Sequence, residues 1–183
     1  MKKMILYIDF DGVILDTIRV SYQMIDERNL QTRDEIEHFY KNLDWENLLK
    51  ISPILNESIS CIEKLIKSNK FDIKILTHVN TEHEVEEKNK FITKHLPGVP
   101  AITCPKEIEK SDFVDPYNCI LVDDYIGNLT SWKENGGIAV KFSDNGKLND
   151  DFMVISKLDQ LLHIDFQTMI NNSKMRVKNR QCV

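Results

Sequence analysis

The chain has 183 residues, of which 42% are hydrophobic and 29% are charged, and its formal net charge is -5 at pH 7. This length and composition predict one globular domain of ordinary size, with room for a small inserted lobe. The negative charge argues against polymeric nucleic acid as a partner, and no apolar stretch approaches the ~20 residues that span a membrane.

The first predicted element is an apolar strand over residues 5–8, which ends at two carboxylates, Asp9 and Asp11, followed by Gly12. The apolar run is too short for the hydrophobic core of a secretory leader, so we expect a cytoplasmic protein. Because the run lacks polar alternation, both faces of the strand should be buried, which predicts a parallel sheet between helices. Two neighbouring acids at the carboxyl end of a buried strand repel each other, and a hard divalent cation is the natural compensating charge.

Helical patterns then follow one another as far as residue 69. The predicted helices cover residues 15–30, 32–40, 44–51 and 52–69. The second begins at a capping-box pattern, Thr32 to Glu35. The fourth begins at Ser52 and Pro53, a serine cap followed by proline at the first helical position. We expect residues 18–51 to form a small helical cap inserted after the first strand.

Strands and helices alternate over the second half of the chain, which is typical of a parallel sheet. The expected strands cover residues 71–77, 99–103, 119–122 and 138–142, and the expected helices cover residues 81–95, 106–113, 128–135 and 158–164. The strand over residues 71–77 ends at Thr77, and the strand over residues 119–122 ends at Asp123 and Asp124. The predicted fold is therefore α/β, a Rossmann-like parallel sheet with helices on both faces and the small cap.

The expected domains are a core of residues 1–17 and 52–165, the cap of residues 18–51 and a basic C-terminal tail of residues 166–183. The basic residues of the tail are Lys174, Arg176, Lys178 and Arg180. They are typical of a solvated terminus, with an anion-attracting arm as the alternative. The four cysteines lack the spacing of metal ligands, and we expect reduced thiols, with Cys61 and Cys119 in the core.

Reactive side chains follow three of the predicted strands. They belong to Asp9, Asp11, Thr77, Asp123 and Asp124, and a lysine, either Lys110 or Lys106, precedes the fourth strand. Because the carboxyl ends of parallel strands meet at one edge of a sheet, we expect these groups to cluster. One Asp could attack phosphorus and a second could move a proton. The other acids could hold Mg²⁺, while Thr and Lys bind the phosphoryl oxygens.

With these motifs in this order, the sequence resembles the haloacid dehalogenase-like (HAD) phosphohydrolases. The matching residues are Asp9-Phe10-Asp11-Gly12-Val13, Thr77 after Lys74-Ile75-Leu76, Lys110, and Leu121-Val122-Asp123-Asp124 followed by Asn128. The resemblance spans residues 4–142, nearly the whole of the expected core and cap.

The resemblance implies a role for each of these side chains. Asp9 would be the nucleophile and Asp11 the general acid/base, while Thr77 and Lys110 would bind the phosphoryl group. The implied ligands of Mg²⁺ are Asp9, the backbone carbonyl of Asp11, and Asp124. Asp123 would be an outer or water-mediated ligand. From the residues alone, Thr77 could instead be an ordinary β-branched strand residue and Asp123 a helix cap.

The short cap, the paired acids Asp123-Asp124 and the run from Trp132 to Gly137 make the chain most similar to the compact 5'(3')-deoxyribonucleotidase branch. That similarity implies a Mg²⁺-dependent phosphatase acting on a nucleoside monophosphate, as a monomer or homodimer. A HAD phosphatase of another small phosphorylated metabolite is the alternative. A phosphoacceptor signalling domain fits less well, because its acceptor aspartate would follow a middle strand where a helix is predicted here.

Aromatic residues of the cap bear on the choice of substrate. Phe39, Tyr40 and Trp45 either stack on a base or sugar or hold together the cap's own small core. The sequence departs from the nucleotidase branch after Thr77, where that branch has small residues and proline and this chain has His78 and Val79. We expect His78 to be a loop residue that at most touches substrate.

Overall fold

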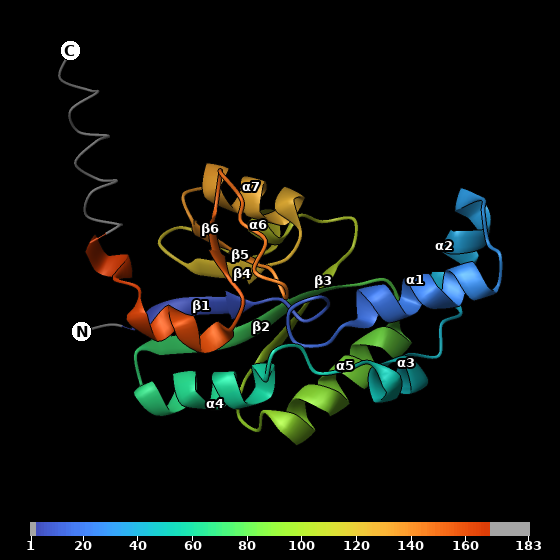
Figure 1. Ribbon diagram of the computed structural model, residues 1–183, viewed down its shortest axis with the longest axis horizontal. Helices are drawn as coiled ribbons and strands as arrows, with labels where there is room; N and C mark the ends of the chain where they lie inside the picture. Colours follow the sequence, from blue (N-terminus) through green and yellow to red (C-terminus); the bar gives the residue numbers. More distant parts are fainter. Residues whose placement is uncertain (1–2, 169–183) are drawn as a thin grey trace, which may run out of the picture.

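The computed structural model describes residues 3–168, which contain a six-stranded parallel sheet with the strand order β3-β2-β1-β4-β5-β6. The strands are β1 (Met4–Ile8), β2 (Phe71–Val79), β3 (Ala101–Pro105), β4 (Ile120–Asp123), β5 (Ile138–Phe142) and β6 (Met153–Ile155). Helices cover both faces of the sheet (Figure 1). The predicted α/β Rossmann-like fold is confirmed.

The helices form two layers and one separate group. They are α1 (Thr17–Glu27), α2 (Arg33–Lys41), α3 (Trp45–Ile51), α4 (Ser58–Ser68), α5 (Glu82–His95), α6 (Lys110–Phe113), α7 (Ile126–Glu134) and the 3-10 helix η1 (Leu158–His163). Figure 1 shows α4, α5 and η1 on one side of the sheet, α6 and α7 on the other, and α1 to α3 beyond the carboxyl end of β1. Among residues 3–168, no helix is long and apolar enough to cross a membrane.

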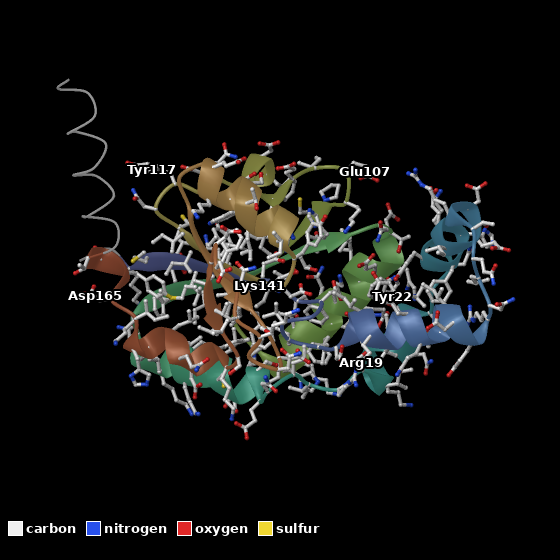
Figure 2. All side chains as sticks on the ribbon, turned by 45° about the horizontal axis from the view of Figure 1, so that its top comes forward. Arg19, Tyr22, Glu107, Tyr117, Lys141 and Asp165 are labelled. Atoms are coloured by element: carbon white, nitrogen blue, oxygen red, sulfur yellow. The ribbon has the colours of Figure 1, made fainter. Side chains whose placement is uncertain are left out.

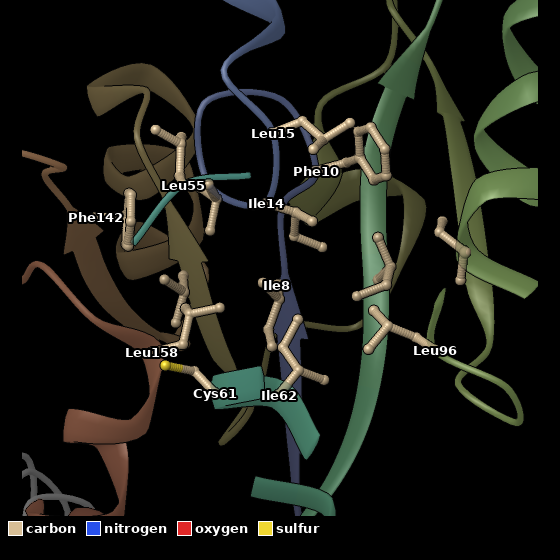
Figure 3. Packing of buried hydrophobic residues seen from close by; sticks show 14 of the residues in the cluster. Ile8, Phe10, Ile14, Leu15, Leu55, Cys61, Ile62, Leu96, Phe142 and Leu158 are labelled. Atoms are coloured by element: carbon tan, nitrogen blue, oxygen red, sulfur yellow. The ribbon is translucent and has the colours of Figure 1, made fainter. Parts of the chain in front are cut away.

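Strand β1 lies at the centre of the sheet and is buried on both faces, as its apolar run predicts. Leu6 and Ile8 belong to the core on the α4 side, where Figure 3 shows Ile8 near Ile62 of α4. Tyr7 points to the opposite face and meets the ring of Trp132 in α7 edge to face, with 5.3 Å between the ring centroids. Burial on both sides holds the end of β1, and with it the two aspartates that follow, in one place.

The inserted helices are anchored by predicted local signals and by the core. The capping box at Thr32 is present, because the Thr32 hydroxyl accepts from the backbone N–H of Glu35 and the Glu35 carboxylate accepts from that of Thr32. Helix α3 packs against the core helix α5 and buries Trp45 and Leu48. The insertion is therefore in direct contact with the sheet's own helical layer.

The helix predicted from Ser52 begins later, at Ser58, so that boundary is wrong. The intervening segment bonds instead to the loop after β1, where the backbone N–H of Leu55 donates to the carbonyl of Ile14 at 3.0 Å. The Ser52 hydroxyl donates to the carbonyl of Leu48 at 2.7 Å and so ends α3 rather than starting α4. Long-range bonds here outweigh the local serine–proline signal.

Strand β2 continues beyond the predicted end at Thr77. His78 and Val79 pair with Cys104 and Pro105 of β3, so Thr77 lies inside the strand. The expectation that His78 is a loop residue is therefore wrong. The reason is that β2 pairs with β3 as far as Val79, so backbone pairing extends β2 past the last residue of its apolar run.

Three smaller differences concern the rest of the chain. The edge strand β6 was not predicted, the final helix is a 3-10 helix, and the helix expected over residues 106–113 is confined to α6. Cys61 and Cys119 are buried in the two core clusters, as expected. The basic residues of the predicted tail lie outside the described residues.

Candidate active site

All six side chains singled out from the sequence lie at the carboxyl edge of the three central strands. They are Asp9 and Asp11 after β1, Thr77 in β2, Lys110 in α6, Asp123 at the end of β4, and Asp124 directly after it. The strand order places β2, β1 and β4 side by side. Residues distant in the chain therefore reach one another here, as expected for a parallel sheet.

Lys110, not Lys106, reaches the first aspartate. Its ammonium group lies 2.8 Å from Asp9 Oδ1 and donates to Asp123 Oδ2 at 2.8 Å, and the side chain is buried. Burial alone would lower the pKa of Lys110, but the carboxylates of Asp123 and Asp9 outweigh it and raise that pKa. Lys106 is exposed and lines the adjoining cavity. Lys110 is thus a fixed positive charge beside Asp9.

Asp9, Asp123 and Asp124 form an acidic cluster, in which one oxygen from each carboxylate lies within 4.8 Å of the others. Burial raises the pKa of Asp9 to about 8, although the charge of Lys110 lowers it, and the neighbouring carboxylates add to the increase. Burial and the charge of Asp123 raise the pKa of Asp124 to about 7. When ionised, these three acids and Lys110 leave two negative charges, which a divalent cation would balance. Hard carboxylate oxygens suit Mg²⁺, so the residues fit that ion.

Asp123 already has donors on both carboxylate oxygens. Oδ2 accepts from Lys110 and from the side-chain amide of Asn128 at 2.9 Å, while Oδ1 accepts from the backbone N–H of Tyr125 at 2.8 Å. The side chain is fully buried and also orders the turn into α7. Asp9 and Asp124 are consequently the carboxylates left to bind a cation directly.

Gly12 leaves room for the carboxylate of Asp124. Its φ is +74°, and a Cβ at this position would lie 2.5 Å from Asp124 Oδ2 and 2.7 Å from Asp124 Cγ. The turn after the two aspartates therefore needs glycine for its backbone conformation and for its contact. This packing holds the Asp124 carboxylate against the β1 loop.

These pKa shifts predict a steep pH dependence of Mg²⁺ binding. Below pH 7 the metal must displace protons from Asp9 and Asp124, whereas at pH 8 most of those protons are gone. We expect Mg²⁺ to bind on the order of a hundredfold more tightly at pH 8 than at pH 6. Calorimetric titrations in buffers of different ionisation enthalpy would measure both the affinity and the protons released. An affinity independent of pH, with no proton release, would contradict the assignment of these ligands.

Asp11 is held by a second set of contacts. Oδ1 accepts from the Thr17 hydroxyl at 2.6 Å, and Oδ2 accepts from Lys88 at 2.5 Å and from the Thr77 hydroxyl at 3.3 Å. Burial alone would raise the pKa of Asp11, but the charge and hydrogen bond of Lys88 lower it overall. Asp11 is therefore ionised, the form that can accept a proton from water.

Lys88 was not identified from the sequence, although a signal for it exists. It follows Val85 by three positions and precedes Ile92 by four, so it lies on the helix face whose apolar residues point to the core. A lysine on the core-facing side of a helix indicates a buried cation, which needs a negatively charged partner elsewhere in the chain. That partner, Asp11, is far away in the sequence.

A cavity of about 690 Å³ opens over these groups and is bounded on its other side by α1, α2 and α3. Its aromatic lining residues are Tyr22, Tyr40, Trp45 and Tyr125. Figure 2 shows Tyr22 projecting from α1 and Glu107, another lining residue, in the loop after β3. Phe39 and Trp45 both belong to the buried core, and Trp45 also lines the cavity, so neither alternative for the cap aromatics holds for all three residues.

Solved structures with the same fold come from the HAD superfamily of hydrolases. A magnesium-bound HAD hydrolase from Bacillus subtilis is 14% identical, with a TM-score of 0.59 over 89% of this chain and 98% of that chain. A haloacid dehalogenase-like hydrolase from Streptococcus pneumoniae is 15% identical, with a TM-score of 0.60 over 88% of this chain and 97% of that chain.

A third similar structure is the D,D-heptose 1,7-bisphosphate phosphatase of Burkholderia thailandensis. It is 13% identical, with a TM-score of 0.52 over 87% of this chain and 96% of that chain. No protein-family model and no curated protein matches the sequence. At identities this low the likeness shows a shared fold, so the chemistry rests on the site itself.

Proposed function

We propose that this chain is a Mg²⁺-dependent phosphomonoester hydrolase in which Asp9 is the nucleophile and Asp11 the general acid/base. The observation that carries the proposal is the arrangement of two buried lysines. Lys110 pairs with Asp9 and Asp123 on one side, and Lys88 holds Asp11 on the other. The two aspartates that the chemistry needs are therefore in different electrostatic surroundings, which is typical of residues with different roles.

In the first half of the proposed reaction, a carboxylate oxygen of Asp9 attacks phosphorus and the bond to the ester oxygen breaks. Asp11 is ionised in the free site, so it first takes up a proton from solvent as the negatively charged ester binds. The departing oxygen then takes this proton from the Asp11 carboxyl group. In the second half, Asp11 removes a proton from water as the water oxygen attacks phosphorus. The bond between phosphorus and Asp9 then breaks, which releases inorganic phosphate and restores both aspartates.

The remaining residues bind and orient the phosphoryl group. Thr77 and Lys110 would donate hydrogen bonds to its non-bridging oxygens. Mg²⁺, when bound by Asp9, the Asp11 carbonyl and Asp124, would neutralise phosphoryl oxygens and orient them for in-line attack. Asp123 would act on the metal only through its neighbours, because its oxygens already accept three hydrogen bonds.

The cavity favours a nucleoside monophosphate as substrate, as in a 5'(3')-deoxyribonucleotidase. Its volume of about 690 Å³ suits a small metabolite. Tyr22 and Tyr125 are 59% and 65% exposed, so their rings are available to stack on a planar base. We propose that α1 to α3 form a cap over the site and supply this selectivity.

A substrate panel tests the proposed function. We expect hydrolysis of phosphate monoesters with Mg²⁺ and loss of at least about 99% of that activity with a chelator, restored by added Mg²⁺. Deoxynucleoside monophosphates should have a kcat/KM about tenfold or more above that of sugar phosphates. A preference for sugar phosphates would leave the phosphatase proposal in place but overturn the nucleotidase assignment. Nucleotide binding with no turnover would overturn both.

A further inference from the structure

Lys88 of α5 is a fully buried cation outside the set of motif residues. Its side chain has no exposure to solvent, and its ammonium group contacts four oxygens. These are Asp11 Oδ2 at 2.5 Å, Glu84 Oε1 at 2.7 Å, the His78 carbonyl at 2.9 Å and Thr77 Oγ1 at 3.0 Å. An ammonium group has three hydrogens, so all are engaged and at least one is shared.

Two aromatic rings also lie close to the ammonium group of Lys88. The nitrogen lies 4.9 Å from the centroid of the Trp45 ring and 5.5 Å from that of Phe10. Trp45 belongs to α3, so the inserted helices help to enclose the lysine. Burying an ammonium group costs several kcal/mol unless its charge is well paired. This arrangement supplies both the partners and the enclosure.

The contacts fix the orientation of Asp11. Lys88 and Thr77 hold one carboxylate oxygen, and Thr17 holds the other at 2.6 Å, so rotation about the Cβ–Cγ bond would break bonds at both. The Asp11 side chain is still 22% exposed and lines the cavity. Lys88 is also bonded to the hydroxyl of Thr77, so one buried cation links the ends of β1 and β2 at the site.

We propose that Lys88 is a positioning residue, which orients Asp11 toward the leaving group and Thr77 toward the phosphoryl group. This inference rests on the proposed phosphatase function. Without Lys88, Asp11 would be protonated more readily but would no longer be held toward the departing oxygen, so it would transfer the proton less well. Substrates whose leaving groups need that proton should therefore suffer most, while substrates that leave as stable anions should be spared.

The test compares Lys88→Met with Lys90→Met across phosphate monoesters of increasing leaving-group basicity, from dinitrophenyl through nitrophenyl and phenyl to glycerol phosphate. Lys90 lies on the same helix, but its side chain is 67% exposed and forms an ion pair with Glu87, away from Asp11. For Lys88→Met we expect kcat/KM, which reports only the steps up to departure of the leaving group, to fall about a hundredfold with glycerol phosphate and less than about fivefold with dinitrophenyl phosphate. Lys90→Met should leave both values unchanged.

Lys88→Met leaves the carboxylates of Asp11 and Glu84 without their cation and could therefore destabilise the fold. A second variant controls for this effect. The double variant Lys88→Met/Glu84→Gln removes one positive and one negative charge together, so the buried charge stays balanced. It should show the same steeper dependence on the leaving group, and inhibition by inorganic phosphate should change less than about threefold.

The outcomes separate the two proposals. If the unmutated chain hydrolyses none of the esters, the proposed function fails. If it hydrolyses them and the variants lose activity uniformly across the series, or become relatively better with glycerol phosphate, the positioning role of Lys88 is overturned. A uniform loss would mean that Lys88 only supports the fold.

Discussion

Replacing Asp9 with asparagine is expected to lower kcat by a factor of about 10⁴ or more, equivalent to about 5.5 kcal/mol of transition-state stabilisation. The reason is that asparagine keeps the size and shape of the side chain but offers no anionic oxygen to attack phosphorus. Lys110 and Asp124 would remain, so the phosphate could still bind. We therefore expect KM to change much less than kcat.

The fold should survive this substitution, so the loss can be assigned to chemistry. Burial raises the pKa of Asp9 to about 8 without metal, far above the value of 3.8 for an unperturbed aspartate. At neutral pH the charge on Asp9 therefore works against folding, and a neutral asparagine should leave the unfolding temperature of the metal-free chain equal or higher. Asp72→Asn, at the opposite end of β2 and exposed, is the matched control and should retain full activity.

The covalent step can be examined directly. Borohydride reduces an aspartyl phosphate to homoserine, so treatment during turnover should convert Asp9 alone, and mass spectrometry of peptides would detect the change. A variant with asparagine at this position that retains more than about 10% of kcat, with no trace of deamidated chain, would overturn the nucleophile assignment. Modification of Asp11 in place of Asp9 would reverse the two roles.

The sequence predicted best those parts of the site that depend on short-range patterns. Asp9 and Asp11 follow a run that could only be a strand buried on both faces, and Asp123 follows a second such run. Because parallel strands share an edge, their meeting point followed from the order of elements. From the residues alone both Lys110 and Lys106 were open; the fold brings Lys110, at the start of α6, to Asp9, whereas Lys106 is exposed in the turn after β3.

Features that depend on distant partners were harder to predict. Lys88 lies in a helix whose sequence is mostly polar, and its burial is stabilised by Asp11, which is far away in the chain. The predicted start of α4 was wrong because the backbone of Leu55 hydrogen-bonds to the loop after β1, and no nearby residue of the sequence indicates this contact. Strand β6 has three residues and one neighbour, so its pairing with β5 defines it more than its composition does. In each case the tertiary contact decides the local structure.

Replacing Gly12 with alanine is expected to disrupt the metal site without removing any of its ligands. The new methyl group would lie 2.5 Å from Asp124 Oδ2, so the carboxylate must move away from Gly12 and from its place beside Asp9. We expect Mg²⁺ affinity to fall at least about tenfold and kcat/KM at limiting Mg²⁺ about a hundredfold. Calorimetry and steady-state kinetics over a range of Mg²⁺ concentrations would measure both.

Gly146→Ala is the control that distinguishes the contact of the Gly12→Ala methyl group with Asp124 from the effect of backbone strain. Gly146 has a φ of +71°, close to the +74° of Gly12, but a Cβ there would meet no atom within 4 Å. Both substitutions should cost about 1 kcal/mol of stability through the left-handed backbone, but only Gly12→Ala should weaken Mg²⁺ binding. If saturating Mg²⁺ restores most of the activity of Gly12→Ala, the displaced ligand is the cause. If Gly12→Ala binds Mg²⁺ as tightly as the unmutated chain, Asp124 is not a ligand, and the cation must be held by Asp9 with groups other than this carboxylate.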